Sequence, residues 1–179
     1  TIKESSYLNP DLTFKPIALH RNEETIMIKN DTVLLSNDIV YFISNQESID
    51  TIIKVCGKES FKIKDIMILG GSRIGVYAAE LLESNFNVTL VEKDKERCEV
   101  IAGMLKRTLV INLDGHDVKQ LEDEGLRDMD AFVTVTADSE MNIMSSLVAK
   151  NHGVKKTIAR VENIDYIHLS QAIGVDTLI

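Results

Sequence analysis

A glycine-rich turn that follows an apolar strand constrains the fold of this chain more than any other segment. The strand and turn run from Ile66 to Gly75, with the sequence Ile-Met-Ile-Leu-Gly-Gly-Ser-Arg-Ile-Gly. Gly70 allows a tight turn out of the strand, Gly75 lets the next helix lie close to the sheet, and the helix N-terminus offers N–H groups to a pyrophosphate. The segment is a near match to the dinucleotide-binding fingerprint. Ser72 replaces the second glycine, and its Cβ takes up room, although its hydroxyl could donate to a phosphate oxygen.

The residues after this turn complete a strand–helix–strand unit. A glycine turn alone is weak evidence, because a strand–helix connection needs glycine for purely structural reasons. Here an apolar face at helical spacing follows, and a second strand ends on Glu92; the apolar positions are Ala78, Ala79, Leu82 and Phe86. Glu92 lies roughly 20 residues on, where a carboxylate accepts both hydroxyls of an adenosine ribose. Asp94 is the better cap for the helix that begins near Lys95, which favours Glu92 as the ribose ligand over a merely solvated carboxylate.

Composition limits the class of protein. The 179 residues are 44% hydrophobic, enough for one good core and a smaller domain beside it. No apolar run approaches the roughly 20 residues of a membrane span, and the first residues lack a secretory signal. The two isolated cysteines, Cys56 and Cys98, are predicted to be reduced, as in the cytoplasm. A net charge of −8 without basic clusters argues against nucleic-acid binding.

Two domains are expected. Residues 1–57 read as a small α+β unit with a helix at about 46–55, and its thin core should pack on a partner; its strands are expected at 14–21, 25–28 and 38–43. A polar linker follows at 57–60, and strands and helices alternate over 64–179. This alternation predicts an α/β fold, a doubly wound parallel sheet of the Rossmann type. Its strands are expected at 66–69, 87–92, 108–111, 131–135, 157–161 and 176–178, and its later helices at 95–105, 118–124, 140–152 and 164–172.

Ligands of such sheets lie at the carboxyl ends of the strands. Asp114 there could line the adenine end of the pocket or simply form a turn with Gly115. Thr136 and Ala137 end the fourth strand near the middle of the cleft, and Asp138 or Ser139 would cap the next helix. The candidate nucleotide-binding residues are Gly70, Gly71, Ser72, Arg73, Ile74, Gly75, Glu92, Lys93, Asp114, Thr136, Ala137, Asn142 and Arg160.

The basic and amide candidates have distinct expected roles. Arg73, just past the turn, is the expected cation for a nucleotide phosphate. Asn142 and Arg160 could reach phosphate or ribose, and Arg160 could equally be a solvated or interface arginine. Glu92 should disfavour the 2′-phosphate of NADP, a repulsion that Lys93 and Arg97 could soften.

Several of these segments together resemble one family. The segments 69–75, 91–94, 113–115, 135–142 and 157–161 follow the motif order of the TrkA-N domain, also called the RCK or KTN domain. Residues 30–57 resemble the small TrkA-C domain. The resemblance spans nearly the whole chain, in the order found at the middle of tandem N, C, N, C arrays, so the chain looks like an internal fragment with an incomplete small domain. Ser72, and Leu113 before Asp114, depart from the family pattern.

The resemblance implies a regulatory role without catalytic residues. It implies a cytoplasmic subunit at the inner face of the cell membrane that binds NAD(H), or ATP and ADP, and gates a potassium uptake system through conformational change. The implied partners are a membrane-embedded potassium transporter subunit of the TrkH or KtrB type and further copies of the chain, as a homodimer or higher oligomer. Direct membrane insertion is not expected.

Two rival functions use the same fold. An NAD-dependent oxidoreductase is one, since a fold does not define a reaction. The short-chain reductase pattern is missing, because Tyr77 is followed four residues later by Leu81, and Tyr166 by Ser170. The four histidines are scattered, so no metal site is expected. A nucleotide-independent assembly module is the other rival, and nucleotide binding would exclude it.

Overall fold

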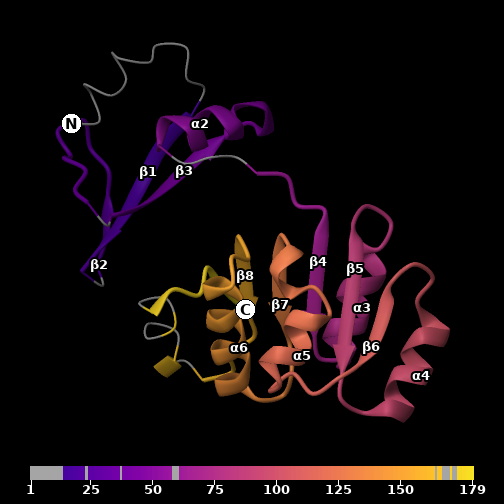
Figure 1. Ribbon diagram of the computed structural model, residues 1–179. Helices are drawn as coiled ribbons and strands as arrows, with labels where there is room; N and C mark the ends of the chain where they lie inside the picture. Colours follow the sequence, from indigo (N-terminus) through magenta and orange to yellow (C-terminus); the bar gives the residue numbers. More distant parts are fainter. Residues whose placement is uncertain are drawn as a thin grey trace. The chain divides into compact units, whose positions relative to one another are not determined.

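The computed structural model describes residues 14–22, 24–36, 38–57, 61–163, 165–166, 170 and 173–179. The chain divides into two compact units, Thr1–Phe61 and Lys62–Ile179 (Figure 1). Each unit has its own sheet, and each is described by itself.

The small unit contains a three-stranded antiparallel sheet in the order β2-β1-β3. Its elements are β1 (Phe14–Arg21), β2 (Glu24–Met27), β3 (Ile39–Ser44), the 3-10 turn η1 (Gln46–Ser48) and α2 (Ile49–Val55). The helix expected over 46–55 therefore starts as a 3-10 turn, because the Asn45 side chain caps it by accepting from the Ser48 N–H. Strand positions agree with the sequence prediction to within a few residues.

The core of the small unit is thin, as expected from its length. Ala18 and Leu19 are the only buried apolar residues among those described in this unit. Phe14 and Phe42 make an edge-to-face contact with ring centroids 5.1 Å apart.

An ion pair holds the loop before β3 in the same unit. Arg21 donates to both carboxylate oxygens of Asp38, at 2.7 and 2.6 Å. These bonds, with the Leu35 N–H, lower the pKa of Asp38 to about 2. A unit with so little buried apolar surface depends more on such contacts, or on a partner, than a larger domain does.

The large unit is a six-stranded parallel sheet in the order β6-β5-β4-β7-β8-β9. Its strands are β4 (Asp65–Leu69), β5 (Asn87–Glu92), β6 (Leu109–Asn112), β7 (Ala131–Thr134), β8 (Lys156–Ala159) and β9 (Thr177–Leu178). Its helices are α3 (Arg73–Leu82), α4 (Lys95–Met104), α5 (Val118–Asp123), η2 (Leu126–Asp128) and α6 (Ser139–Asn151). The helix expected at 164–172 lies mostly outside the described residues. The order confirms the doubly wound sheet.

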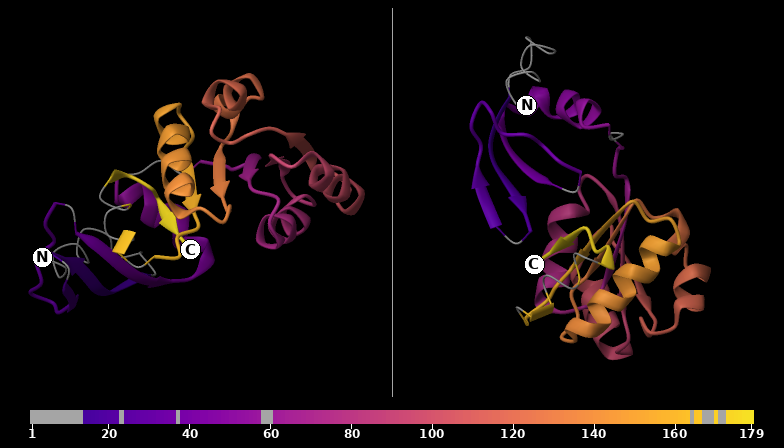
Figure 2. Two further views of the ribbon diagram at one scale, coloured as in Figure 1. Left: turned by 90° about the horizontal axis from the view of Figure 1, so that it is seen from below. Right: turned by 90° about the vertical axis from the view of Figure 1, so that its left-hand side faces the viewer.

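Helices cover both faces of this sheet (Figure 2). On one face, Ile68 and Leu90 pack with Ala79 of α3 and Ile101 of α4. On the other face, Met67 and Phe132 pack with Leu121 of α5 and Ala149 of α6. Strands buried on both faces must be apolar at every position, which explains the unbroken apolar run of β4.

The strand order places one crevice at the carboxyl edge of the sheet. The chain leaves β4 toward β5 on one side, and β7 lies on the other side of β4. Connections on opposite faces diverge at this point, which is the topological switch where α/β sheets bind ligands. The candidate residues after β4, β5 and β7 therefore lie around the same opening.

Candidate functional site

The turn between β4 and α3 requires glycine at both ends. Gly70 has φ +114°, and a Cβ there would lie 3.0 Å from the Thr136 backbone N. A Cβ on Gly75 would lie 2.0 Å from the Gly70 carbonyl oxygen. Both glycines thus let the helix start directly against the sheet, as the sequence predicts.

Ser72 is the N-cap of α3. Its hydroxyl oxygen accepts from the Gly75 N–H at 3.3 Å, and the hydroxyl donates to the Val135 carbonyl at 3.0 Å. The hydroxyl proton is therefore already used, which corrects the expectation that Ser72 donates to a phosphate. The first N–H groups of an α-helix have no partners within the helix, and the Ser72 cap satisfies that of Gly75. The remaining ones are suited to an anion.

Glu92 lies against this helix start. Its Oε2 accepts from the Gly71 N–H at 2.7 Å, and its Oε1 accepts from the Asp94 N–H at 2.9 Å. Gly71 must be glycine for this contact, since a Cβ there would lie 2.8 Å from Oε2. Asp94 caps α4, as the sequence predicts, by accepting from the Arg97 N–H. Two backbone bonds thus hold the Glu92 carboxylate at the end of β5.

Arg97 is a site residue that the set of candidates omits. Its Nε donates to the Gly71 carbonyl at 3.0 Å, so its side chain reaches from α4 across to the turn. The signal for this position was present: the Asp94 cap fixes where α4 begins, and Arg97 lies in its first turn.

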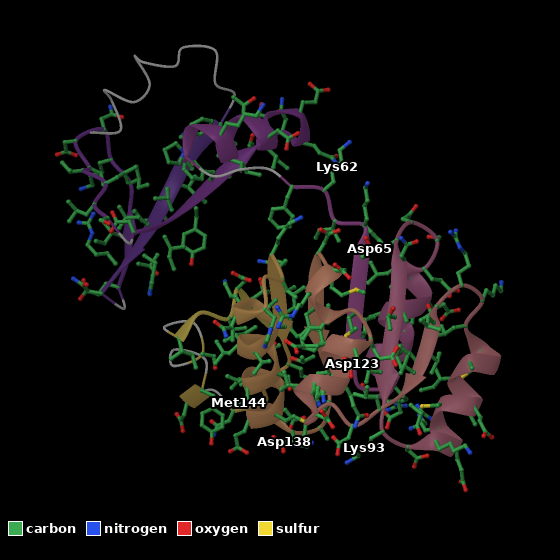
Figure 3. All side chains as sticks on the ribbon, viewed as in Figure 1. Lys62, Asp65, Lys93, Asp123, Asp138 and Met144 are labelled. Carbon is green, nitrogen blue, oxygen red and sulfur yellow. The ribbon has the colours of Figure 1, made fainter. Side chains whose placement is uncertain are left out.

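The cleft at this edge has a volume of about 560 Å³. Eight of the candidate residues line it: Gly70, Gly71, Ser72, Glu92, Lys93, Asp114, Thr136 and Ala137. Further lining residues, which the candidate set omits, are Leu69, Val91, Asp94, Arg97, Leu113, Gly115, His116, Asp138 and Met141. Lys93 and Asp138 follow different strands, and Figure 3 shows both at the opposite end of the sheet from Asp65, which begins β4.

One wall of the cleft is apolar. A Cβ on Gly115 would lie 2.5 Å from Leu69 Cδ1 and 2.8 Å from Met141 Cε, so these side chains pack tightly where glycine leaves room. Leu113 is buried beside them in the same cluster. Such a surface is typical of pockets for flat, weakly polar rings.

Asp114 forms a turn and also lines this wall. Its Oδ1 accepts from the His116 N–H at 3.1 Å and lies 2.8 Å from His116 Nδ1. These two bonds lower the pKa of Asp114. Asp114 therefore forms the turn that was one of the two alternatives, and it also lies at the rim of the cleft; its place at the adenine end stays a prediction.

Five candidates do not line the cleft: Arg73, Ile74, Gly75, Asn142 and Arg160. Gly75 contacts the turn through its backbone, because its lack of a Cβ leaves room for the Gly70 carbonyl oxygen. Arg73 and Ile74 instead line a groove over the outer side of α3. The structure therefore does not bring the Arg73 side chain to the phosphate turn, because this residue points away from the crevice on the first turn of α3.

Asn142 holds the loop after β7 in place. Its Oδ1 accepts from the Thr136 N–H and hydroxyl, at 3.0 and 2.7 Å, and its Nδ2 donates to the carbonyls of Thr136 and Arg160, at 3.1 and 2.9 Å. The residue is 1% exposed. This corrects the expectation that Asn142 reaches a ligand, since burial and backbone partners occupy its whole amide.

Arg160 stabilises the same loop from β8. Its Nη1 donates to the Thr136 carbonyl at 3.0 Å, and its Nη2 pairs with Glu162. The guanidinium thus bonds to the backbone and to a carboxylate in this structure, and of the two roles left open for Arg160 these contacts do not favour the ligand role.

Neither a metal site nor a membrane-spanning helix is found among the described residues. No group of three or more histidines, cysteines or acidic residues among them could hold a metal ion. Within the same part of the chain, no helix is both long enough and apolar enough to cross a membrane.

The strand order, the glycine turn and the carboxylate at the end of β5 define a Rossmann-like domain. The chain belongs to the TrkA-N domain family, whose model matches residues 66–179.

Curated relatives are named for potassium uptake. Trk system potassium uptake protein trkA homolog 1 of Methanosarcina mazei is 35% identical over 161 residues, covering 89% of this chain and 40% of that protein. Trk system potassium uptake protein TrkA of Halomonas elongata is 33% identical over 170 residues, covering 95% of this chain and 37% of that protein. The chain thus spans about two fifths of the length of these relatives.

Solved structures share the fold. The RCK domain of GsuK matches all of this chain and 38% of its own, with a TM-score of 0.64 and 19% identity. The GsuK channel bound to NAD matches with a TM-score of 0.63, again at 19% identity over the whole of this chain and 32% of its own. GsuK bound to ADP matches 65% of this chain and 30% of its own, with a TM-score of 0.55 and 21% identity.

Proposed function

We propose that the cleft binds an adenine nucleotide, NAD(H) or ADP and ATP. The observation that carries this proposal is the pairing of the Glu92 carboxylate with the Gly71 N–H at 2.7 Å. The contact supports the proposal because a carboxylate there would accept from ribose hydroxyls, next to helix N–H groups that suit a pyrophosphate. A nucleotide has both matching features: a pair of ribose hydroxyls for the carboxylate and an adjacent anion for the helix N–H groups.

The rest of the cleft supports a nucleotide of this class. The pyrophosphate would lie at the turn from Gly70 to Ser72, with the adenosine ribose on Glu92. The apolar wall around Leu113 and Met141 would take the adenine, with Asp114 at its rim. Thr136 and Ala137 would border the second half of a dinucleotide.

The function we propose for the chain is regulation of potassium uptake. Support comes from relatives named as Trk system potassium uptake proteins and from the fold shared with the GsuK channel. The small unit would be a TrkA-C-like domain. The whole protein would work in the cytoplasm at the inner face of the membrane, as a homodimer or higher oligomer bound to a membrane-embedded potassium transporter. Nucleotides would act by binding one conformation of that assembly more tightly than another.

Calorimetric titration of the 179-residue chain with NAD, NADH, ADP and ATP tests the binding proposal. We expect at least one of these nucleotides to bind, and we expect Glu92→Gln to weaken it while Glu96→Gln, an exposed position of α4, leaves it unchanged. Failure of all four to bind would favour an assembly module. NADH oxidation during incubation with a metabolite extract would favour an oxidoreductase.

Potassium uptake tests the regulatory proposal. Glu92→Gln is introduced into the full-length protein, and uptake is followed in cells that lack the native copy. Regulation is supported if potassium uptake responds to nucleotide in wild type and this response changes in Glu92→Gln. Uptake that is equal in wild type, Glu92→Gln and a strain without the protein would contradict it.

A further inference from the structure

Helix α3 carries apolar residues on its outer side as well as on the side that faces the sheet. Gly75, Val76 and Ala79 are buried against the sheet. On the opposite side, Ile74 is 46% exposed, Tyr77 63% and Leu81 59%. A surface helix normally has a polar outer face, and a helix that is apolar on all sides is normally buried on all sides. The outer side of α3 therefore has the composition of an interface.

The exposed apolar residues of α3 form a seam. They follow the spacing i, i+3, i+7, which is the a/d pattern of paired helices. Beside the seam, α4 exposes Met104 by 60% and, one turn earlier, Val100 by 55%. A groove of about 620 Å³ runs between the two helices, and Tyr77 and Met104 both line it. A second helix fits into such a groove by placing its own side chains between those of the first.

Two charges flank this seam in positions that a lone helix disfavours. Arg73 lies in the first turn of α3, near the positive end of the helix dipole, and Glu80 lies in the last turn, near the negative end. Both side chains also border the groove. Among the described residues, neither has a hydrogen bond or ion-pair partner. The two residues are about two helical turns apart on one side of the helix.

We propose that α3 packs antiparallel against α3 of a second copy of this chain. In an antiparallel pair with the seam at a and d, Arg73 and Glu80 occupy g positions, and g residues of the two helices face each other. Arg73 of one copy then meets Glu80 of the partner subunit, twice by symmetry, as an isologous interface requires. Each arginine also moves to the negative end of the partner's helix dipole. The charge pattern is self-complementary in this orientation, which identifies a second copy as the occupant.

Sedimentation velocity of the full 179-residue chain over a range of concentrations measures this association. We expect wild type to dimerise and Leu81→Lys to raise the dimer dissociation constant by roughly tenfold or more, because it places like charges in the interface. Met144→Lys is the matched control: Met144 is 60% exposed on α6, where Figure 3 labels it. This interface rests on the homodimer that the proposed function includes. Thermal unfolding and nucleotide titration of Leu81→Lys should remain as in wild type, so a failure of the interface can be distinguished from a failure of nucleotide binding.

A charge-swap series tests the antiparallel register. Arg73→Glu and Glu80→Arg should each weaken the dimer, and the double variant should restore it, since the pairs re-form with reversed sign. A monomeric wild type, covered at this face by its own small unit or by nothing, would overturn the proposal. A dimer that Leu81→Lys leaves intact, or a double variant weaker than both single variants, would also overturn it.

Discussion

The Glu92 carboxylate and the Gly71 N–H are joined by a hydrogen bond of 2.7 Å, although 21 residues separate them in the sequence. The bond connects the carboxyl end of β5 to the turn after β4. It orients one carboxylate oxygen toward the turn, while the other is held by the Asp94 N–H. Any ligand that occupies the turn therefore meets a carboxylate in a fixed position.

Replacing Glu92 with alanine tests this carboxylate as the ribose acceptor. We expect Glu92→Ala to weaken binding of NAD(H) by about 1–3 kcal/mol, because the ribose hydroxyls lose a charged acceptor. Calorimetry measures the change. Glu99→Ala, an exposed position of α4, is the control for a general loss of acidic charge. Equal affinities in wild type and Glu92→Ala would remove Glu92 from the site.

Discrimination between NAD and NADP tests the sign of the same group. NADP should bind more weakly by about 1.4 kcal/mol, or roughly tenfold, because its 2′-phosphate would lie beside the Glu92 carboxylate. Glu92→Gln should reduce this difference. Tighter binding of NADP by wild type at low salt would show that Lys93 and Arg97 dominate the ribose end.

Gly71 offers a test in which both nucleotide binding and stability should change. In Gly71→Ala, the new Cβ would lie 2.5 Å from Ile101 Cδ1 and 2.8 Å from Glu92 Oε2, so the carboxylate must move. We expect weaker nucleotide binding with a stability loss of about 1–3 kcal/mol. Gly103→Ala in α4 meets no atom within 4 Å and should stabilise the protein by about 0.4–1 kcal/mol. Calorimetry and urea unfolding of both variants make the comparison, and unchanged binding by Gly71→Ala would contradict it.

Local rules were sufficient to predict the sheet and its turn. The unbroken apolar run before Gly70, the caps and the alternation of elements depend on neighbouring residues, and each strand lies within a few residues of its expected place. Gly70 and Gly75 could be assigned for the same reason, since backbone geometry determines them.

Side-chain direction in three dimensions could not be predicted in the same way. Arg73, Asn142 and Arg160 all follow strands at the correct edge, yet none lines the cleft. Asn142 points inward because the Thr136 loop offers it a complete set of backbone partners, a fact that depends on how α6 packs on β7. The Asp94 cap placed Arg97 in the first turn of α4, near the ribose end, but its bond to the Gly71 carbonyl depends on how α4 packs against the turn.

The role of Asn142 can itself be tested. Asn142→Ala leaves the Thr136 N–H and the Arg160 carbonyl without their partner, while the Thr136 carbonyl keeps its bond from Arg160, and we expect the variant to lower the free energy of unfolding by about 1–3 kcal/mol. Met144→Ala, on the exposed side of the same helix, should change it far less. Urea unfolding measures both. A variant with wild-type stability and reduced nucleotide affinity would restore the ligand role expected from the sequence.

Glu83, at the end of α3, gives a prediction of pH dependence. The residue is 7% exposed, and its carboxylate accepts from the Arg107 N–H at 2.8 Å and from the N–H groups of Lys106 and Thr108 as well. Chiefly because of the Arg107 bond, the pKa of Glu83 falls from 4.5 to about 2. A carboxyl with a lowered folded-state pKa contributes stability that is fully present above its unfolded value and is lost as the pH falls through its folded value.

We therefore expect Glu83→Gln to be less stable than wild type at pH 7, and the difference to shrink as the pH falls from about 4.5 toward 2. Urea unfolding at a series of pH values measures this difference. Asp38 and Asp130, whose pKa values are also lowered to about 2, remain in both proteins and cancel in the comparison. Glu99→Gln controls for the loss of a surface carboxylate. At pH 2.5 a fraction of the Glu83 carboxyls is protonated. A stability difference between wild type and Glu83→Gln that stays constant from pH 7 to pH 2.5 would therefore show that the Glu83 contacts contribute through shape alone and not through charge.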